Sequence, residues 1–81
     1  MKVRVLFFAA LAHDIGKRDS TLDLSDNATV KDALSTLSRE YPAVGRYQSR
    51  LATAVNLEYV GPEHPLCDND ELAVIPPVSG G

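Results

Sequence analysis

Hydrophobic and polar residues alternate near the start of the chain, over residues 2–8. Charged side chains mark one face of this segment, which also carries Leu6 and Phe8. The opposite face is wholly apolar and carries Val3, Val5 and Phe7. Successive residues of a strand point to opposite sides, so the pattern predicts a strand whose apolar face lies in the core.

Four later segments are also predicted to be extended: residues 20–24, 51–56, 58–60 and 71–75. In the first of these, Leu22 and Leu24 alternate with polar residues and are expected to point inward. In the last, Leu72 and Val74 are expected to do the same. The segments 2–8 and 20–24 follow each other closely, and we expect them to form an antiparallel pair.

The main helix is predicted over residues 30–40. Thr29 followed by Asp32 resembles a capping box, and Pro42 disfavours helical geometry at the residue before it. Apolar residues recur at helical spacing and predict one buried stripe: Val30, Ala33, Leu34, Leu37 and Tyr41.

Three segments are predicted to be connections. Residues 9–18 are expected to hold one helical turn before Gly16, which suits a positive φ. Residues 43–50 are expected to form a connector that turns at Gly45. Residues 67–70 read as a tight polar turn in which Asn69 takes the left-handed conformation.

This order of elements predicts an α+β fold, a mixed sheet with one main helix packed on one face. The other face is then open. If the first and last strands are neighbours, Leu6 and Phe8 lie beside Ala73 and Ile75 and form an apolar strip, which usually marks a partner surface. The alternative is that loops cover Leu6 and Phe8.

The last six residues, 76–81, have small or rigid side chains. Pro76 and Pro77 donate no backbone hydrogen bonds, so the last strand should end there, giving a domain at 1–76 and a flexible tail at 77–81. The six residues from Pro76 onward can extend about 20 Å at ~3.3 Å per residue. Gly80 and Gly81 carry no Cβ and can enter a narrow active site. The alternative is an idle terminus.

Composition limits the classes of function. A chain of 81 residues forms one small domain without an enclosed substrate cavity, so a self-contained enzyme is not expected. A net charge of −3 with scattered basic residues argues against nucleic acid, and no apolar run approaches the ~20 residues of a membrane span. The unpaired Cys67 and the lack of a charged-then-apolar leader predict the cytoplasm.

The sequence does not favour a metal site, a reactive thiol or a nucleophilic hydroxyl. His13, His64 and Cys67 lack the paired spacings of a zinc site, so we expect no bound metal and no bound cofactor. Cys67 is expected to be a passive, partly buried residue, and Ser79 has no neighbouring base. The remaining chemical group is the C-terminal carboxylate of Gly81, which becomes reactive only when another protein activates it.

Four stretches together resemble one family. They are KVRVLFFA at residues 2–9, AVN at 54–56, HPLCDNDELA at 64–73 and PPVSGG at 76–81. The chain thereby resembles the small subunit of molybdopterin synthase, a ubiquitin-like β-grasp sulfur carrier. The chain departs from the family pattern at two places. Ala12, His13 and Asp14 stand where Arg-Glu is usual, and Asn69 stands where a glycine is frequent. The first change could alter partner specificity.

The resemblance implies a function for the tail. An adenylyltransferase of the ubiquitin-activating type uses ATP to make an acyl-adenylate at Gly81, and a sulfur donor converts it to a thiocarboxylate. The large synthase subunit, in a complex of two small and two large subunits, then receives the tail residues Pro77, Val78, Ser79, Gly80 and Gly81. Sulfur passes to a cyclic pyranopterin monophosphate, forming the molybdopterin dithiolene. The resemblance also implies that Phe8, Tyr59 and Ile75 contact both partners.

Two alternatives remain open. In the first, Gly81 forms isopeptide bonds with lysines, as a ubiquitin-like modifier does. In the second, the chain carries sulfur to another pathway, such as thiazole, cysteine or tRNA thiolation. Proline-proline before the diglycine and the HPL run favour the synthase subunit.

Overall fold

A computed structural model describes residues 1–77 of the chain. Their elements, in chain order, are β1 (Lys2–Phe7), α1 (Ala9–Ile15), β2 (Asp19–Asp23), α2 (Val30–Glu40), α3 (Pro42–Tyr47), the 3-10 helix η1 (Gln48–Arg50), β3 (Ala52–Val55), β4 (Glu58–Val60) and β5 (Glu71–Ile75). All five predicted strands are therefore present, with ends that shift by at most one residue. The first, for example, ends at Phe7 instead of Phe8.

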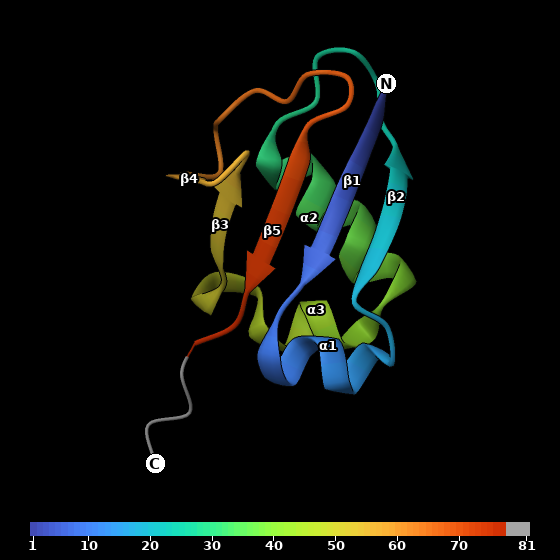
Figure 1. Ribbon diagram of the computed structural model, residues 1–81, viewed down its shortest axis with the longest axis vertical. Coiled ribbons are helices and arrows are strands. Elements are labelled where there is room, and N and C mark those ends of the chain that lie inside the picture. Colours follow the sequence, from blue (N-terminus) through green and yellow to red (C-terminus); the bar gives the residue numbers. More distant parts are fainter. Residues whose placement is uncertain (78–81) are drawn as a thin grey trace.

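The strands form one mixed sheet in the order β2-β1-β5-β3-β4. The expected antiparallel pairing of β1 with β2 is confirmed, while β1 and β5 run parallel at the centre. Figure 1 shows α2 crossing one face of the sheet, with α1 and α3 at the end toward which β1 and β5 run. No helix of the described residues lies on the opposite face of the sheet. The predicted α+β architecture is confirmed.

The core lies between the sheet and α2. Val3 and Val5 are fully buried and Phe7 is 4% exposed, as their alternation predicted. Leu72 and Val74 meet them from β5, again fully buried. The helix contributes Val30, Ala33 and Leu37, whereas the other members of its predicted stripe, Leu34 and Tyr41, are only partly buried, as is Leu24.

The capping box of α2 is present. The Asp32 N–H donates to Thr29 Oγ1 at 3.4 Å, and the Thr29 N–H donates to Asp32 Oδ2 at 2.9 Å. These bonds satisfy backbone donors that the first helical turn leaves without partners. The helix ends at Glu40, as Pro42 predicted.

The predicted connector over residues 43–50 was wrong. Pro42 begins α3, and Gly45 lies inside this helix instead of forming a turn. Proline suits the first position of a helix, where its missing N–H is not needed. Ala43 and Val44 are buried against the rest of the core. Tertiary packing thus makes this segment helical.

The segment after β1 is also more helical than predicted. One turn was expected, but α1 covers seven residues and buries Leu11 completely. The positive φ predicted for Gly16 is confirmed at 86°, and its N–H caps the helix by donating to the Ala12 carbonyl. Asn69 likewise has the left-handed conformation that the turn requires, with a φ of 68°.

Candidate docking face and tail root

The open face of the sheet carries a row of side chains across four strands. Leu6 on β1 is opposite Ala73 on β5, Ala73 is opposite Ala54 on β3, and Ala54 is opposite Tyr59 on β4. Residues paired in register point to the same side of a sheet. These four side chains therefore lie on the face that α2 does not cover.

A second row lies closer to the end of β5. Ile75 is opposite Ala52, and the Phe8 N–H donates to the Val74 carbonyl at 3.3 Å, which keeps Phe8 beside this end of the strand. Phe8 is 44% exposed, and Leu6 and Ile75 are half-buried. The first and last strands are neighbours, which meets the condition for the expected apolar strip, and Phe8 is not enclosed by a loop.

Sequence reasoning missed one member of this surface, Leu57. Asn56 and Leu57 form the two-residue turn between β3 and β4, with positive φ values of 50° and 74°. Leu57 is 93% exposed. A two-residue connection between strands is the signal that could have revealed the turn, because its usual types need positive φ. Glycine would adopt this conformation without strain, whereas leucine is strained in it and gains no burial within the domain. We therefore take Leu57 as a candidate contact with a partner protein.

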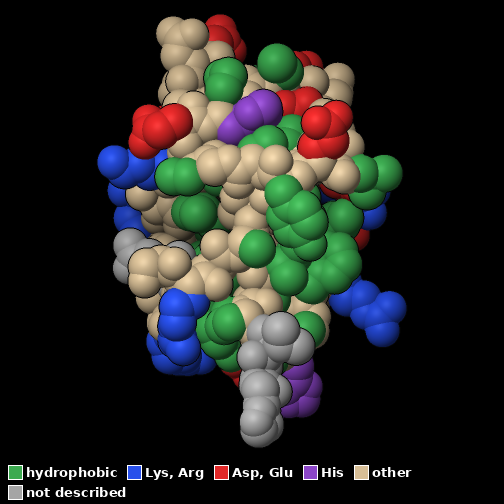
Figure 2. Space-filling model, turned by 90° about the vertical axis from the view of Figure 1, so that its left-hand side faces the viewer, with side chains coloured by type: hydrophobic (Ala, Val, Ile, Leu, Met, Phe, Trp, Pro, Cys, Tyr) green, Lys and Arg blue, Asp and Glu red, His purple; other side chains and the backbone are tan. Residues whose placement is uncertain are grey.

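We call this apolar surface the docking face and define it by Leu6, Phe8, Tyr59, Ala73 and Ile75, by Ala54, which is only 8% exposed, and by Leu57 of the adjoining β3–β4 turn. Tyr59, which only the family resemblance had indicated, is 78% exposed on it. Figure 2 looks onto the β3–β4 edge of the sheet and shows a cluster of hydrophobic side chains there. Large exposed aromatic and aliphatic side chains in one patch are typical of a protein-binding surface.

The neighbouring part of the same face is charged. Lys2 Nζ lies 3.0 Å from Asp23 Oδ2, and Arg4 Nη2 lies 3.0 Å from Asp19 Oδ2. Both pairs join β1 to β2 on the open side of the sheet. The docking face is therefore bordered by a polar rim, as a recognition surface commonly is.

The root of the tail is held at the centre of the sheet. β5 is hydrogen-bonded to β1 on one side and to β3 on the other, so the direction of the chain at Ile75 is fixed by two ladders. Pro76 is buried and Pro77 is exposed. The candidate residues Val78, Ser79, Gly80 and Gly81 lie outside the described residues.

Other titratable groups do not gather into a site. Within residues 1–77, no group of three or more His, Cys, Asp or Glu side chains could hold a metal ion. Cys67 is exposed, which corrects the expectation of partial burial, because the turn that carries it faces away from the core. None of the helices in the described part of the chain is long and apolar enough to cross a membrane.

One pKa shift lies away from the docking face, at Tyr41. Hydrogen bonding with the Ser20 hydroxyl, and then with Lys17, holds the pKa of the Tyr41 phenol below its ordinary value of 10.0. Tyr41 Oη lies 3.2 Å from both partners. The ring also packs edge-on against Phe7, with ring centres 5.5 Å apart. Tyr41 thus joins the end of α2 to the start of β2 and has a structural role.

A five-stranded mixed sheet wrapped around one main helix, with a parallel central pair formed by the first and last strands, defines a ubiquitin-like β-grasp protein. The chain belongs to the ThiS family, whose model matches residues 5–81.

Relatives and solved structures agree with this assignment. The chain is 37% identical to the molybdopterin synthase sulfur carrier subunit of Chlamydomonas reinhardtii, over 100% of both proteins. It superimposes on SAMP1 of Haloferax volcanii with a TM-score of 0.89 at 32% identity, covering 100% of each chain. It also resembles a chain in a complex of subunits 1 and 2 of the molybdopterin-converting factor from Helicobacter pylori, with a TM-score of 0.72, 26% identity and 100% coverage of both chains.

Proposed function

We propose that this chain is the sulfur carrier subunit of a molybdopterin synthase. The observation that carries the proposal is that one strand, β5, supplies both the centre of the docking face and the root of the tail. A partner seated on Ala73 and Ile75 meets the tail where it leaves the sheet. The full-length similarity to sulfur carrier subunits supports the same function.

In this proposal the reacting group is the Gly81 carboxylate. A carboxylate oxygen attacks the α-phosphate of ATP in an adenylyltransferase of the ubiquitin-activating type, and pyrophosphate leaves. A sulfur nucleophile at the oxidation level of sulfide then forms a bond to the carbonyl carbon and displaces AMP, and loss of its proton leaves a thiocarboxylate on Gly81. The chain itself binds no cofactor, because its part in these steps is to dock and to present its terminus.

The thiocarboxylate then delivers sulfur to a cyclic pyranopterin monophosphate in the large subunit of the synthase. Two successive carriers supply the two sulfurs of the dithiolene, in an assembly of two small and two large subunits. The solved complex of subunits 1 and 2 of the molybdopterin-converting factor supports a large-subunit partner. In this proposal, Pro77, Val78 and Ser79 bridge the distance between the sheet and the active site of the large subunit. Gly80 and Gly81 enter the part of that site where a Cβ would not fit. The unpaired Cys67 fits a reducing compartment, so the proposed reaction belongs in the cytoplasm.

The test is the intact mass of the chain produced together with its activating enzyme. The expected result is a mass gain equal to the exchange of one oxygen for one sulfur, located at Gly81 by fragmentation. A variant that lacks Gly81 is the matched control and should show no gain. An unchanged mass of the full-length chain contradicts the proposal.

A second candidate is a ubiquitin-like protein modifier whose Gly81 forms isopeptide bonds with lysines. The similarity to SAMP1, a small archaeal modifier protein, favours it. The same sample separates the two functions, because a modifier produces conjugates on many proteins that depend on Gly81.

A further inference from the structure

A groove of about 740 Å³ lies beside the docking face, between the end of β1, α1 and the start of β2. Leu6 and Phe8 belong to both surfaces, so the groove continues the docking face. Ala12 forms part of its wall, where a small side chain leaves room. The lining also includes three cationic or titratable side chains, namely His13, Lys17 and Arg18.

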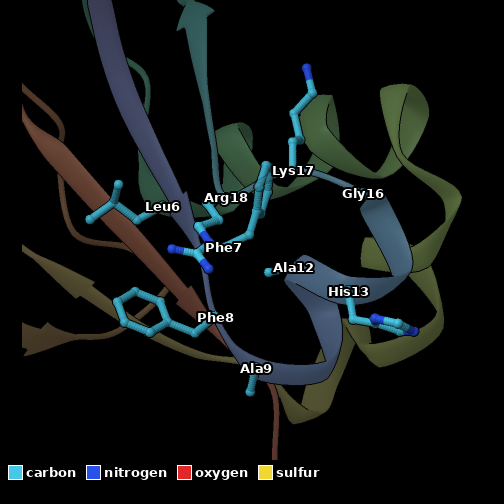
Figure 3. Close-up of a pocket in the computed structure, with 9 residues that line it drawn as sticks. All are labelled: Leu6, Phe7, Phe8, Ala9, Ala12, His13, Gly16, Lys17 and Arg18. Carbon is cyan, nitrogen blue, oxygen red and sulfur yellow. The ribbon is translucent and has the colours of Figure 1, made fainter.

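These side chains are not equally free to bind a partner. Figure 3 shows the Arg18 guanidinium on the side of β1 that carries Leu6 and Phe8, whereas Lys17 points away from them. Lys17 Nζ donates to Tyr41 Oη at 3.2 Å and lies 5.4 Å from the centre of its ring. Lys17 is therefore already engaged within the domain, while Arg18 reaches into the groove.

Arg18 differs from the two cations of the polar rim. Lys2 and Arg4 each have an aspartate within 3.0 Å. The Arg18 side chain is exposed and forms no ion pair or hydrogen bond with the described residues. An uncompensated guanidinium thus borders the docking face of a protein whose net charge is −3.

We propose that Arg18 binds a carboxylate side chain of the partner protein that covers the docking face. This inference rests on the proposed function for the identity of that partner, the large synthase subunit. Apolar contact at Leu6 and Phe8 removes water from the groove, and a cation that loses its water without gaining an anion disfavours association. The planar guanidinium matches a carboxylate with two parallel hydrogen bonds. The predicted contact on the partner is therefore an Asp or Glu flanked by apolar residues.

The experiment measures binding of the full chain to the purified large subunit by calorimetry, at low and at physiological salt. Arg18→Glu should weaken binding at least about tenfold, and Arg18→Lys should weaken it less. Arg39→Glu is the matched control, because Arg39 is an exposed arginine on α2, across the sheet, and its reversal changes the net charge equally. It should leave the affinity unchanged. Circular dichroism confirms that each variant is folded.

The carboxylate is then identified by charge exchange. Replacing the correct Asp or Glu of the large subunit by Lys should restore binding of Arg18→Glu and weaken binding of the wild-type chain. Equal affinity of Arg18→Glu and wild type would overturn the inference and leave the proposed function intact. If inorganic phosphate competes with the large subunit for the chain and no Asp or Glu replacement restores binding of Arg18→Glu, the choice of a carboxylate is overturned. Failure of the wild-type chain to bind would overturn the proposed function and this inference together.

Discussion

The side-chain amide of Asn56 donates a hydrogen bond of 2.9 Å to Asp70 Oδ1, joining the β3–β4 turn to the turn that precedes β5. Asn56 Oδ1 also accepts from the Glu71 N–H at 3.0 Å, and Asp70 Oδ2 accepts from the Cys67 N–H at 2.7 Å. One asparagine thus connects the hairpin that carries Leu57 with the strand that leads to the tail.

Replacing Asn56 tests this connection. Asn56→Gly keeps the positive φ of the turn but removes both side-chain hydrogen bonds, and we expect it to lower the free energy of unfolding by about 1–3 kcal/mol. Urea unfolding measures the change. Asn69→Gly is the control, since it also replaces an asparagine of positive φ, and it should change stability little. Equal stability of Asn56→Gly and wild type would show that the two turns are not coupled through Asn56.

Leu57→Gly should have opposite effects on stability and binding. Leucine in the left-handed region is strained by roughly 1–2 kcal/mol, and glycine relieves this strain at a smaller entropic cost, so the melting temperature should rise. Binding to the large subunit should weaken, because a 93% exposed apolar side chain of the docking face is lost. Unchanged affinity would remove Leu57 from the docking face.

Tyr59→Ala should affect binding far more than folding. Tyr59 is 78% exposed on the short strand β4, so its truncation should change stability by less than about 1 kcal/mol. An aromatic side chain at a protein interface often supplies 2 kcal/mol or more, so affinity for the large subunit should fall at least about tenfold. Thermal melting and calorimetry measure the two quantities. A large loss of stability with normal affinity would assign Tyr59 a structural role.

Deleting Gly81 should abolish sulfur transfer and leave the melting temperature unchanged, because the described core ends at buried Pro76. Ser79→Ala keeps the length of the tail and should retain transfer, since the proposed mechanism does not use the Ser79 hydroxyl. Single-turnover conversion of the pyranopterin precursor is the measurement. Retained transfer without Gly81 would exclude the tail from the mechanism.

The Tyr41 phenol should titrate below its ordinary pKa of 10.0, because hydrogen bonding first with Ser20 and then with Lys17 favours the phenolate. Because the pKa is lower in the folded state than in the unfolded state, the free energy of unfolding increases as pH rises through the folded-state pKa. The contribution of Tyr41 is complete above the ordinary pKa of 10.0. No such contribution exists at neutral pH. Absorbance titration of a variant with Tyr47→Phe and Tyr59→Phe isolates Tyr41, and adding Ser20→Ala should raise its midpoint. An unchanged midpoint would contradict the assigned cause.

Local patterns predicted most of the sheet, because alternation in residues 2–8 and 71–75 determines which side chains face α2. They also placed Leu6 and Phe8 beside Ala73 and Ile75 on the condition that the first and last strands are neighbours, and the pairing of β1 with β5 meets this condition. The segment 42–50 could not be assigned in this way. Its helix depends on burying Ala43 and Val44 against elements distant in sequence.

The candidate site was predicted less completely. Strand β4 has only three residues, too few for alternation to reveal the orientation of Tyr59, which came from family resemblance alone. Leu57 belongs to the docking face because of turn geometry, not hydrophobic pattern. Arg18 gained its candidate role only when the ion pairs of Lys2 and Arg4 were known, since sequence alone does not show which cations are neutralised.

The central position of β5 also has a mechanical consequence. A pulling force on the C-terminus acts along the strand, so it must shear the ladders to β1 and β3 together and cannot open them one bond at a time. The domain therefore resists unfolding when its end is pulled, a resistance that the proposed transfer between two enzymes would use.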